Sequence, residues 1–109
     1  MKRGAIVVVA AKGAYARKPR PAVIVQSDLF NPTHSSVTVC PITSDCIDAS
    51  LFRLTLPRGP RTGLKTISQI MVDKIVSVPR STIAAQIGHC DPGELDAIDE
   101  GLRRWLEIE

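Results

Sequence analysis

The sequence predicts a mainly β protein that ends in one α-helix, an α+β class with a small, strongly bent antiparallel sheet or barrel. Short apolar runs rich in β-branched residues, such as "AIVVVAA" at 5–11, alternate with loops dense in proline and glycine. The final stretch, "DPGELDAIDEGLRRWLEIE" (91–109), has the spacing of an amphipathic helix. With 109 residues, 44% of them apolar and 23% charged, the chain is expected to form one domain over 1–109.

The other strands are expected from similar patterns. The run "AVIVQSD" (22–28) indicates a second buried strand. The run "VTVCPITS" (37–44) alternates and is expected to stop at Pro41, because proline cannot donate to a central ladder. The stretch "FRLTL" (52–56) alternates cleanly, and "SQIMVDKIVSV" (68–78) favours one longer strand. The turn-rich stretches between these runs are 12–21, 31–36 and 57–63.

Helical signals come late in the chain. Ser81 can cap a short helix through "STIAAQI" (81–87). In the final helix, Asp91 is the expected N-cap, with Pro92 at the first helical position and Glu94 three residues after the cap. The residues predicted to share its apolar face are Leu95, Ile98, Leu102, Trp105 and Leu106.

Composition excludes several classes of protein. No run approaches the roughly 18 apolar residues of a membrane helix, and charge returns at Lys12 with no cleavage motif after it, so a cytoplasmic protein is expected. Cys40, Cys46 and Cys90 are odd in number and match no paired motif. We therefore expect buried or unreactive thiols, with no disulfide framework, no metal site and no cofactor.

Positive charge is concentrated at the start of the chain. The formal net charge is only +3, yet no acid precedes Asp28. The cations before it are Lys2, Arg3, Lys12, Arg17, Lys18 and Arg20. This distribution suggests a polyanionic partner, either nucleic acid or an acidic peptide, although a solvated charged surface explains the charge equally well.

Arg20 is the first candidate for chemistry. It lies between Pro19 and Pro21 at the start of a predicted buried strand. Each proline fixes its own φ and restricts the residue before it, so the guanidinium is held in place. A pre-positioned guanidinium binds phosphate oxygens bidentately and stays charged at physiological pH. The alternative is a surface arginine beside prolines that protect an edge strand.

Three further residues are candidates, each with a structural alternative. Thr43 ends a predicted strand, where its hydroxyl could donate to a phosphate or cap the turn, as could Ser44. Asp73 interrupts an apolar strand, either as an outward-facing ion-pair member or as a buried site residue. Tyr15 could stack on a nucleobase or pack its loop. Nucleotide-binding, zinc-protease and serine-hydrolase motifs are absent, so catalysis would depend on arginine, hydroxyl and carboxylate groups without a metal.

The chain resembles the MazF/PemK family, the endoribonuclease toxins of type II toxin–antitoxin pairs. The matching stretches run in family order along nearly the whole chain. They are "KRG" (2–4), "RPAVIVQSDLFN" (20–31), "VTVCPITS" (37–44), "SQIMVDKIVSVPRS" (68–81) and "IGHCDPGELDAIDEGLRRWL" (87–106). The resemblance implies a small SH3-like barrel of the CcdB/PemK type with a C-terminal helix, a homodimer, and a groove for single-stranded RNA across the two-fold interface.

The resemblance also implies an activity: sequence-selective, metal-independent cleavage of RNA. The 2′-hydroxyl would attack the adjacent phosphodiester and leave a 2′,3′-cyclic phosphate and a 5′-hydroxyl. Arg20 would neutralise charge on the phosphate oxygens, and Thr43 would hydrogen-bond the phosphate. Asp73 aligns with a family carboxylate and is a candidate base or orienter. The residues predicted to bind RNA are Lys12, Tyr15, Arg17, Lys18 and Ser44.

The expected partner besides RNA is a cognate antitoxin with an acidic, flexible tail that would suit the cationic stretches 12–20 and 57–65. Two alternatives remain open. One is a CcdB-like gyrase poison acting through its C-terminal residues, including Trp105 and Ile108, although Trp105 is expected to pack on the helix's apolar face. The other is a barrel that binds nucleic acid without cutting it.

Overall fold

The computed structural model describes residues 1–10 and 18–109. Seven strands and a C-terminal helix form along the described chain, with two short 3-10 turns between strands. The strands are β1 (Ala5–Val9), β2 (Arg20–Ile24), β3 (Ser36–Thr43), β4 (Arg53–Leu56), β5 (Ser68–Met71), β6 (Val76–Pro79) and β7 (Ile83–His89). The 3-10 turns cover Val72–Lys74 and Arg80–Thr82, and the helix α1 covers Pro92–Leu106.

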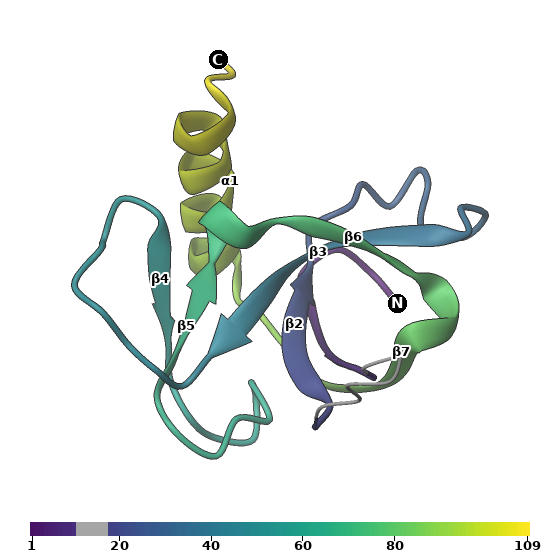
Figure 1. Cartoon of the computed structure of the whole chain (residues 1–109), viewed down its shortest axis with the longest axis horizontal. Helices are drawn as coiled ribbons and strands as arrows, with labels where there is room; N and C mark the ends of the chain where they lie inside the picture. The colour runs from purple at the N-terminus through teal and green to yellow at the C-terminus, as the bar shows by residue number, and fades with distance from the viewer. Residues whose placement is uncertain (11–17) are drawn as a thin grey trace.

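The strands form one antiparallel, strongly bent sheet (Figure 1). Its order is β4-β5-β3-β2-β1-β7, and β6 pairs with β3 beside this path. Strands β4 and β7 are the two ends of the path, so the sheet curves like a small barrel without closing. The predicted fold class, mainly β with a C-terminal helix, is confirmed. Helix α1 stands against the β4–β5 side of the sheet in Figure 1.

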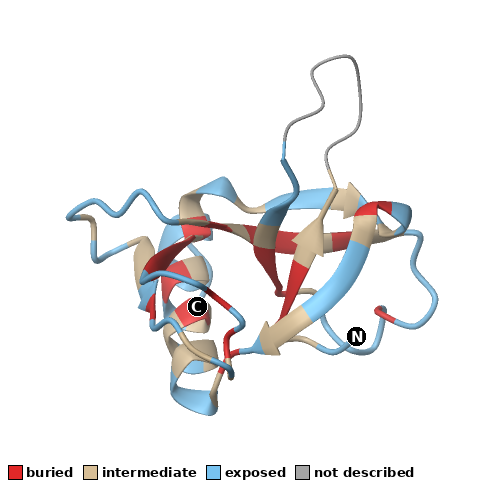
Figure 2. Ribbon diagram, turned by 90° about the horizontal axis from the view of Figure 1, so that it is seen from below, coloured by how far each residue is buried: buried red, intermediate tan, exposed pale blue. Residues whose placement is uncertain are grey.

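Two apolar clusters lie on opposite faces of the central strands. Figure 2 shows buried residues along these strands and in the helix. Alternate residues of a strand point to opposite faces, so Val23 and Ala22 of β2 belong to different clusters. The larger cluster, around Ile6, Ile42, Ile70 and Ile98, is covered by α1. The smaller one contains the residues Ala5, Val7, Ala22, Ile24, Val37 and Val39.

Strand β3 passes through Pro41, where the sequence predicted that it would stop. The reason is a change of partner along one side of β3. Residues Ser36–Val39 pair with β6, and Ile42 and Thr43 pair with β5. Pro41 lies between these two ladders, at a position where no hydrogen-bond donor is required on that side.

The predicted strand over 68–78 is divided into β5 and β6 by the 3-10 turn at Val72–Lys74. Val72 is fully buried in the larger cluster, and its side chain packs on Gly101 of α1. The turn directs Asp73 toward Arg53, with 3.2 Å between Oδ1 and Nε. Packing under α1 and this ion pair therefore account for the break, which strand propensity alone did not predict.

The helix predicted over 81–87 is wrong. Residues Ile83–His89 form β7, which pairs along β1 with two register shifts. Arg80–Thr82 form a 3-10 turn without a side-chain cap, and the Thr82 hydroxyl donates to the Pro79 carbonyl at its start. Pairing with the buried strand β1 overrides the helix propensity of the Ala84–Gln86 stretch.

Helix α1 begins as predicted. The Asp91 carboxylate accepts from the Glu94 amide at 2.7 Å, and Glu94 accepts from the Asp91 amide at 2.9 Å, which completes a capping box ahead of Pro92. Its apolar face is buried at Ile98, but Trp105 is half-exposed and packs obliquely on Phe52 with 5.9 Å between ring centroids. The predicted burial of the helix therefore fades toward its C-terminus.

Among the residues described, no helix has the length and apolar character needed to cross a membrane.

Candidate functional site

Arg20 and Thr43 come together at one end of the sheet. The β2–β3 ladder pairs Ala22 with Pro41 and Ile24 with Val39. Continuing this register by two residues places Arg20, the first residue of β2, opposite Thr43, the last residue of β3. On its other side Arg20 pairs with Val9 of β1. Both predicted side chains are therefore fixed by central strands, which favours precise positioning.

The Arg20 guanidinium is exposed and, within the described part of the chain, has no carboxylate partner. The alternative was a surface arginine beside prolines that protect an edge strand, but β2 pairs with β1 on one side and with β3 on the other, so it is not an edge strand. Pro21 follows it in the ladder opposite Val8, so the backbone at Arg20 has little freedom. An exposed guanidinium on an anchored backbone, unpaired within the described residues, is available to an anionic ligand.

The first of two cavities beside Arg20 has a volume of about 430 Å³. We call it the hydroxyl-lined cavity, because Ser44, Thr66 and Ser68 line it together with Arg20 and Lys65. Its floor is the open end of the larger apolar cluster, at Ile42 and Leu64. The predicted RNA-binding residue Ser44 therefore lies in the same cavity as Arg20.

The second cavity, of about 360 Å³, also has Arg20 and Pro21 in its wall. We call it the aliphatic cavity, and its apolar lining includes Val9, Ala22, Val39, Pro41, Val76 and Val78. It is the open end of the smaller apolar cluster. Lys18, another predicted RNA-binding residue, also lines it.

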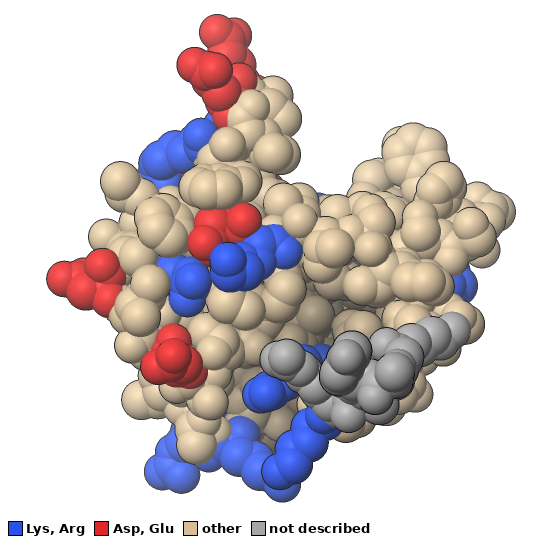
Figure 3. Space-filling model, viewed as in Figure 1, with Lys and Arg blue, Asp and Glu red and all other residues tan. Residues whose placement is uncertain are grey.

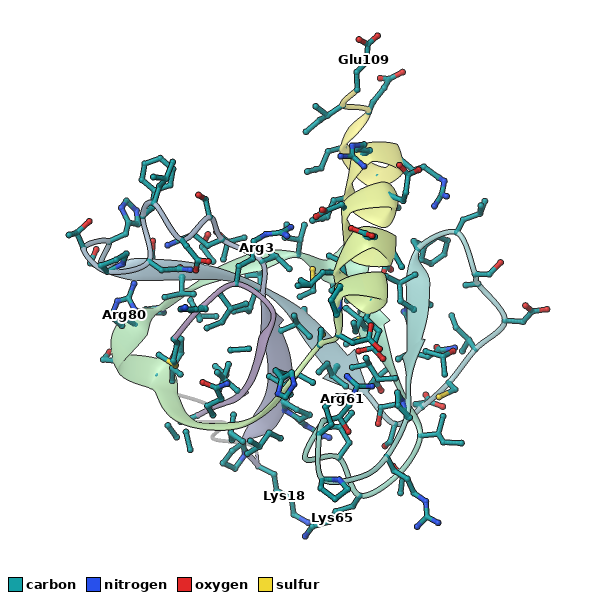
Figure 4. All side chains as sticks on the ribbon, turned by 180° about the vertical axis from the view of Figure 1, so that it is seen from behind. Arg3, Lys18, Arg61, Lys65, Arg80 and Glu109 are labelled. Atoms are coloured by element: carbon teal, nitrogen blue, oxygen red, sulfur yellow. The ribbon has the colours of Figure 1, made fainter. Side chains whose placement is uncertain are left out.

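Four cations gather at this end of the molecule: Lys18, Arg20, Arg58 and Lys65. We call them the cationic rim. Figure 3 shows Lys and Arg side chains along the lower edge of the molecule, and Figure 4 shows Lys18 and Lys65 projecting from that same edge. No ion pair is found for any of the four among the described residues. An uncompensated cluster of this kind attracts polyanions.

The sequence predicted Lys65 only as part of a cationic loop, not as a neighbour of Arg20. The loop is held in place by the buried Thr62, whose hydroxyl donates to the Pro57 carbonyl at 2.7 Å. Gly63 has a φ of +72°, and a Cβ there would lie 2.2 Å from the Ile87 carbonyl oxygen. The close approach of this loop to β7 therefore requires glycine. The sequence shows that the loop contains Gly63, but it does not show that the loop packs against β7.

Thr43 has an observed structural role, and its hydroxyl stays a predicted phosphate donor. Its Oγ1 accepts a hydrogen bond from the Asp45 amide at 3.0 Å, which stabilises the turn after β3. That bond uses the oxygen as an acceptor and leaves the hydroxyl proton available as a donor. One Thr43 side chain can therefore both cap the turn and donate to a phosphate, the two roles considered from the sequence.

Asp73 is not brought to Arg20 within the chain. Asp73 lines neither of the two cavities that Arg20 lines. Asp73 is instead the partner of Arg53, and the two side chains are only 13% and 11% exposed. Of the two roles considered for Asp73, the ion pair is observed, and the catalytic role stays a prediction.

The remaining predicted RNA-binding residues, Lys12, Tyr15 and Arg17, lie outside the described residues. Of the cysteines, Cys40 and Cys90 are buried and Cys46 is exposed, and all three are free. In the described ranges, no three His, Cys, Asp or Glu side chains are grouped so that they could hold a metal ion.

The sequence and the fold both match known proteins. Residues 2–106 match the profile of the PemK-like, MazF-like toxins of type II toxin–antitoxin systems. A probable endoribonuclease MazF of Mycolicibacterium smegmatis is 43% identical over 108 residues, which cover 99% of this chain and 98% of the relative.

Two solved structures show the same fold. A MazE–MazF structure from Deinococcus radiodurans has a TM-score of 0.84 at 22% identity and covers 100% of this chain and 98% of its own. An endoribonuclease in complex with its cognate antitoxin from a mycobacterial species has a TM-score of 0.79 at 17% identity, covering 100% and 97%. With its family profile matched almost from end to end, the chain belongs to the PemK-like, MazF-like toxin family of type II toxin–antitoxin systems.

Proposed function

We propose that this chain is a sequence-selective, metal-independent endoribonuclease that acts as the toxin of a toxin–antitoxin pair. The observation that carries the proposal is the exposed Arg20 guanidinium, unpaired among the described residues, between two cavities and opposite Thr43. Family membership and the endoribonuclease name of the relative from M. smegmatis support the same activity.

The proposed reaction is an internal transesterification. The ribose 2′-oxygen forms a bond to the adjacent phosphorus while the bond from phosphorus to the 5′-oxygen breaks. The products are a 2′,3′-cyclic phosphate and a 5′-hydroxyl. Negative charge builds up on the non-bridging oxygens in the transition state, and Arg20 donates two hydrogen bonds to them from its planar fork. Because β2 anchors the Arg20 backbone, the guanidinium starts from a defined point at the end of the sheet as the charge develops.

Thr43 donates its hydroxyl proton to a phosphate oxygen beside Arg20, while the Asp45 amide fixes the orientation of its oxygen. The described lining of both cavities contains no carboxylate and no imidazole. In this mechanism the 2′-hydroxyl proton therefore leaves to water, and the 5′-oxygen takes its proton from water. Asp73 forms an ion pair with Arg53 and takes no part in the proton transfers of this mechanism.

Selectivity for RNA follows from the nucleophile, since DNA lacks the 2′-hydroxyl. Affinity for a single strand is supported by the cationic rim, because Lys18, Arg58 and Lys65 can neutralise flanking phosphates. Such binding is expected to weaken as the salt concentration rises.

The test compares purified wild type, Arg20→Ala and Arg103→Ala on single-stranded RNA in excess EDTA. Arg103 is an exposed cation on α1 that pairs with Glu100, so its removal changes charge without touching the site. Wild type and Arg103→Ala are expected to cut, and Arg20→Ala is expected to lose roughly 100-fold or more in rate. Undiminished cleavage by Arg20→Ala would remove Arg20 from the mechanism.

The proposed partners are a cognate antitoxin and a second copy of the chain. Two neighbours of the same fold are described as a MazE–MazF structure and as a complex with a cognate antitoxin. An acidic antitoxin segment would complement the cationic rim and compete with RNA for it. Light scattering of the free protein tests the homodimer, and inhibition of cleavage by the antitoxin encoded next to this chain tests the competition.

One observation keeps a gyrase poison as a second candidate. Trp105 and Ile108 are about half exposed near the end of the chain, where a protein partner could contact them. A topoisomerase assay with a truncation after Arg104 separates the candidates, because a poison would lose its effect and a nuclease would keep its site at the other end of the fold.

A further inference from the structure

The backbone at Arg20 and Pro21 lies between two cavities, one lined partly by hydroxyl groups and the other mainly by aliphatic side chains. Arg20 and Pro21 line both the hydroxyl-lined cavity and the aliphatic cavity. The cavities are the open ends of the two apolar clusters, which lie on opposite faces of β2. Their volumes, about 430 and 360 Å³, are at the lower end of the range for small-ligand pockets. A strand of RNA whose phosphate rests on Arg20 has one such cavity on either side.

The aliphatic cavity offers mainly apolar contact area, and among its described lining residues only Lys18 and Arg20 have side chains that can donate hydrogen bonds. Its described walls are alanine, valine and proline, and the two cations Lys18 and Arg20 also line it. Apolar walls of this kind hold any base by exclusion of water and discriminate weakly between ligands of similar shape.

The hydroxyl-lined cavity offers selective contacts. The Ser68 hydroxyl is engaged with the Thr66 carbonyl at 3.0 Å. The Ser44 and Thr66 side-chain hydroxyls, by contrast, make no hydrogen bond to the rest of the described protein, and both line the cavity with Lys65. Each hydroxyl can donate and accept, and Lys65 can donate to a base oxygen or ring nitrogen. Ser44, Lys65 and Thr66 are exposed in the free protein. A base that covers them without pairing with them therefore loses more affinity than one that meets apolar walls.

We propose that the two nucleotides flanking the cleaved phosphate bind on opposite sides of the Arg20–Pro21 step and are selected unequally. The base in the hydroxyl-lined cavity is chosen by Ser44, Thr66 and Lys65, and the base in the aliphatic cavity is accepted with little preference. Sequence selectivity at the cut is therefore one-sided. This inference rests on the proposed ribonuclease function and adds the residues that set its specificity.

The experiment cleaves a library of short RNAs, randomised on both sides of the cut, with wild type, with Ser44→Ala/Thr66→Val and with Val76→Ala. Sequencing of the product ends gives the base preference at each flanking position. For wild type we expect a preference of about tenfold or more at one position and a weak preference at the other. Thermal melting of each variant confirms that it is folded.

Each variant has a different expected outcome. Ser44→Ala/Thr66→Val is expected to relax the strong preference and leave the weak position unchanged. Val76→Ala removes apolar area from the aliphatic cavity, so it is expected to lower kcat/KM for all sequences alike. Equal preferences at the two positions in wild type, or an unchanged preference in the hydroxyl variant, would overturn the inference while leaving the ribonuclease function intact. Absence of all cleavage by wild type would overturn both.

Discussion

Arg20 opens strand β2 and Thr43 closes strand β3, and continuing the register of the β2–β3 ladder two residues beyond the Ala22–Pro41 pair places them opposite one another. The two residues are 23 positions apart in the chain, yet each is fixed by a central strand with partners on both sides. The result is a charged hydrogen-bond donor and a neutral one at the same end of the sheet. Everything proposed about catalysis depends on this pairing.

Replacing Thr43 by valine tests the second donor. Valine keeps the β-branched shape that suits β3 but removes the hydroxyl. We expect the rate of RNA cleavage to fall roughly 100-fold, as for the loss of one transition-state hydrogen-bond donor. The unfolding free energy should fall by about 1 kcal/mol, because the bond from the Asp45 amide is also lost. Thr43→Ser is the control, and a valine variant as active as the serine variant would show that the hydroxyl only caps the turn.

Replacing Asp73 by alanine separates its observed role from its predicted catalytic one. The change leaves the Arg53 guanidinium without its carboxylate at a site where both side chains are largely buried. We expect the unfolding free energy, measured in urea, to fall by on the order of 3 kcal/mol. Cleavage per folded molecule should stay at the wild-type level. A double variant, Arg53→Met/Asp73→Leu, should recover part of the stability, and a stable but inactive Asp73→Ala protein would instead support the carboxylate as a base.

The buried thiols predict how stability varies at alkaline pH. Burial raises the pKa of Cys40 and of Cys90 from 9.0 to about 12 in the folded protein. Between pH 9 and 12 the unfolded chain therefore binds fewer protons than the folded protein. The contribution of the two thiols to the unfolding free energy is complete below pH 9 and is lost as the pH rises toward 12. The slope approaches about 1.4 kcal/mol per pH unit for each thiol. Replacing Cys40 by alanine should flatten the decline measured in urea, and an equal decline in that variant would assign it to other groups.

The glycine that brings the Lys65 loop to the site gives a further prediction. In Gly63→Ala, the new Cβ would meet the Ile87 carbonyl at a φ that alanine rarely adopts. We expect a loss of about 2 kcal/mol in unfolding free energy. Gly93→Ala is the matched control, because that position is in the first turn of α1 with its nearest neighbour at 3.5 Å. It should be neutral or slightly stabilising, and equal effects of the two changes would contradict the close approach.

The sequence was most informative where local chemistry determines structure. The capping box at Asp91 and Glu94 and the buried strand at Ala5–Val9 were predicted because neighbouring residues alone determine them. The helix expected at 81–87 was wrong because β7 is stabilised by pairing with β1, a partner more than 70 positions away. The continuous strand at 68–78 failed for a similar reason, since Val72 leaves the strand to pack beneath α1.

The site shows the same division. Arg20 was singled out by its flanking prolines and Thr43 by its place at the end of a strand, and the family resemblance implied the catalytic roles predicted for both. The position of Lys65 beside Arg20 depends on the contact between its loop and β7, and no local pattern carries that information. Asp73 was assigned to a strand that does not continue as predicted, and the turn that replaces it gives the carboxylate to Arg53.

The most direct test of the catalytic account uses a single RNA that the wild type cuts once, in EDTA, beside the same RNA with one 2′-deoxynucleotide immediately before the cut. The account predicts a 2′,3′-cyclic phosphate and a 5′-hydroxyl from the first RNA and no cut at that bond in the second, with Arg20→Ala failing on both. Cleavage of the deoxy-substituted bond, or a 5′-phosphate at the product end, would contradict attack by the neighbouring hydroxyl and with it the role given to Arg20.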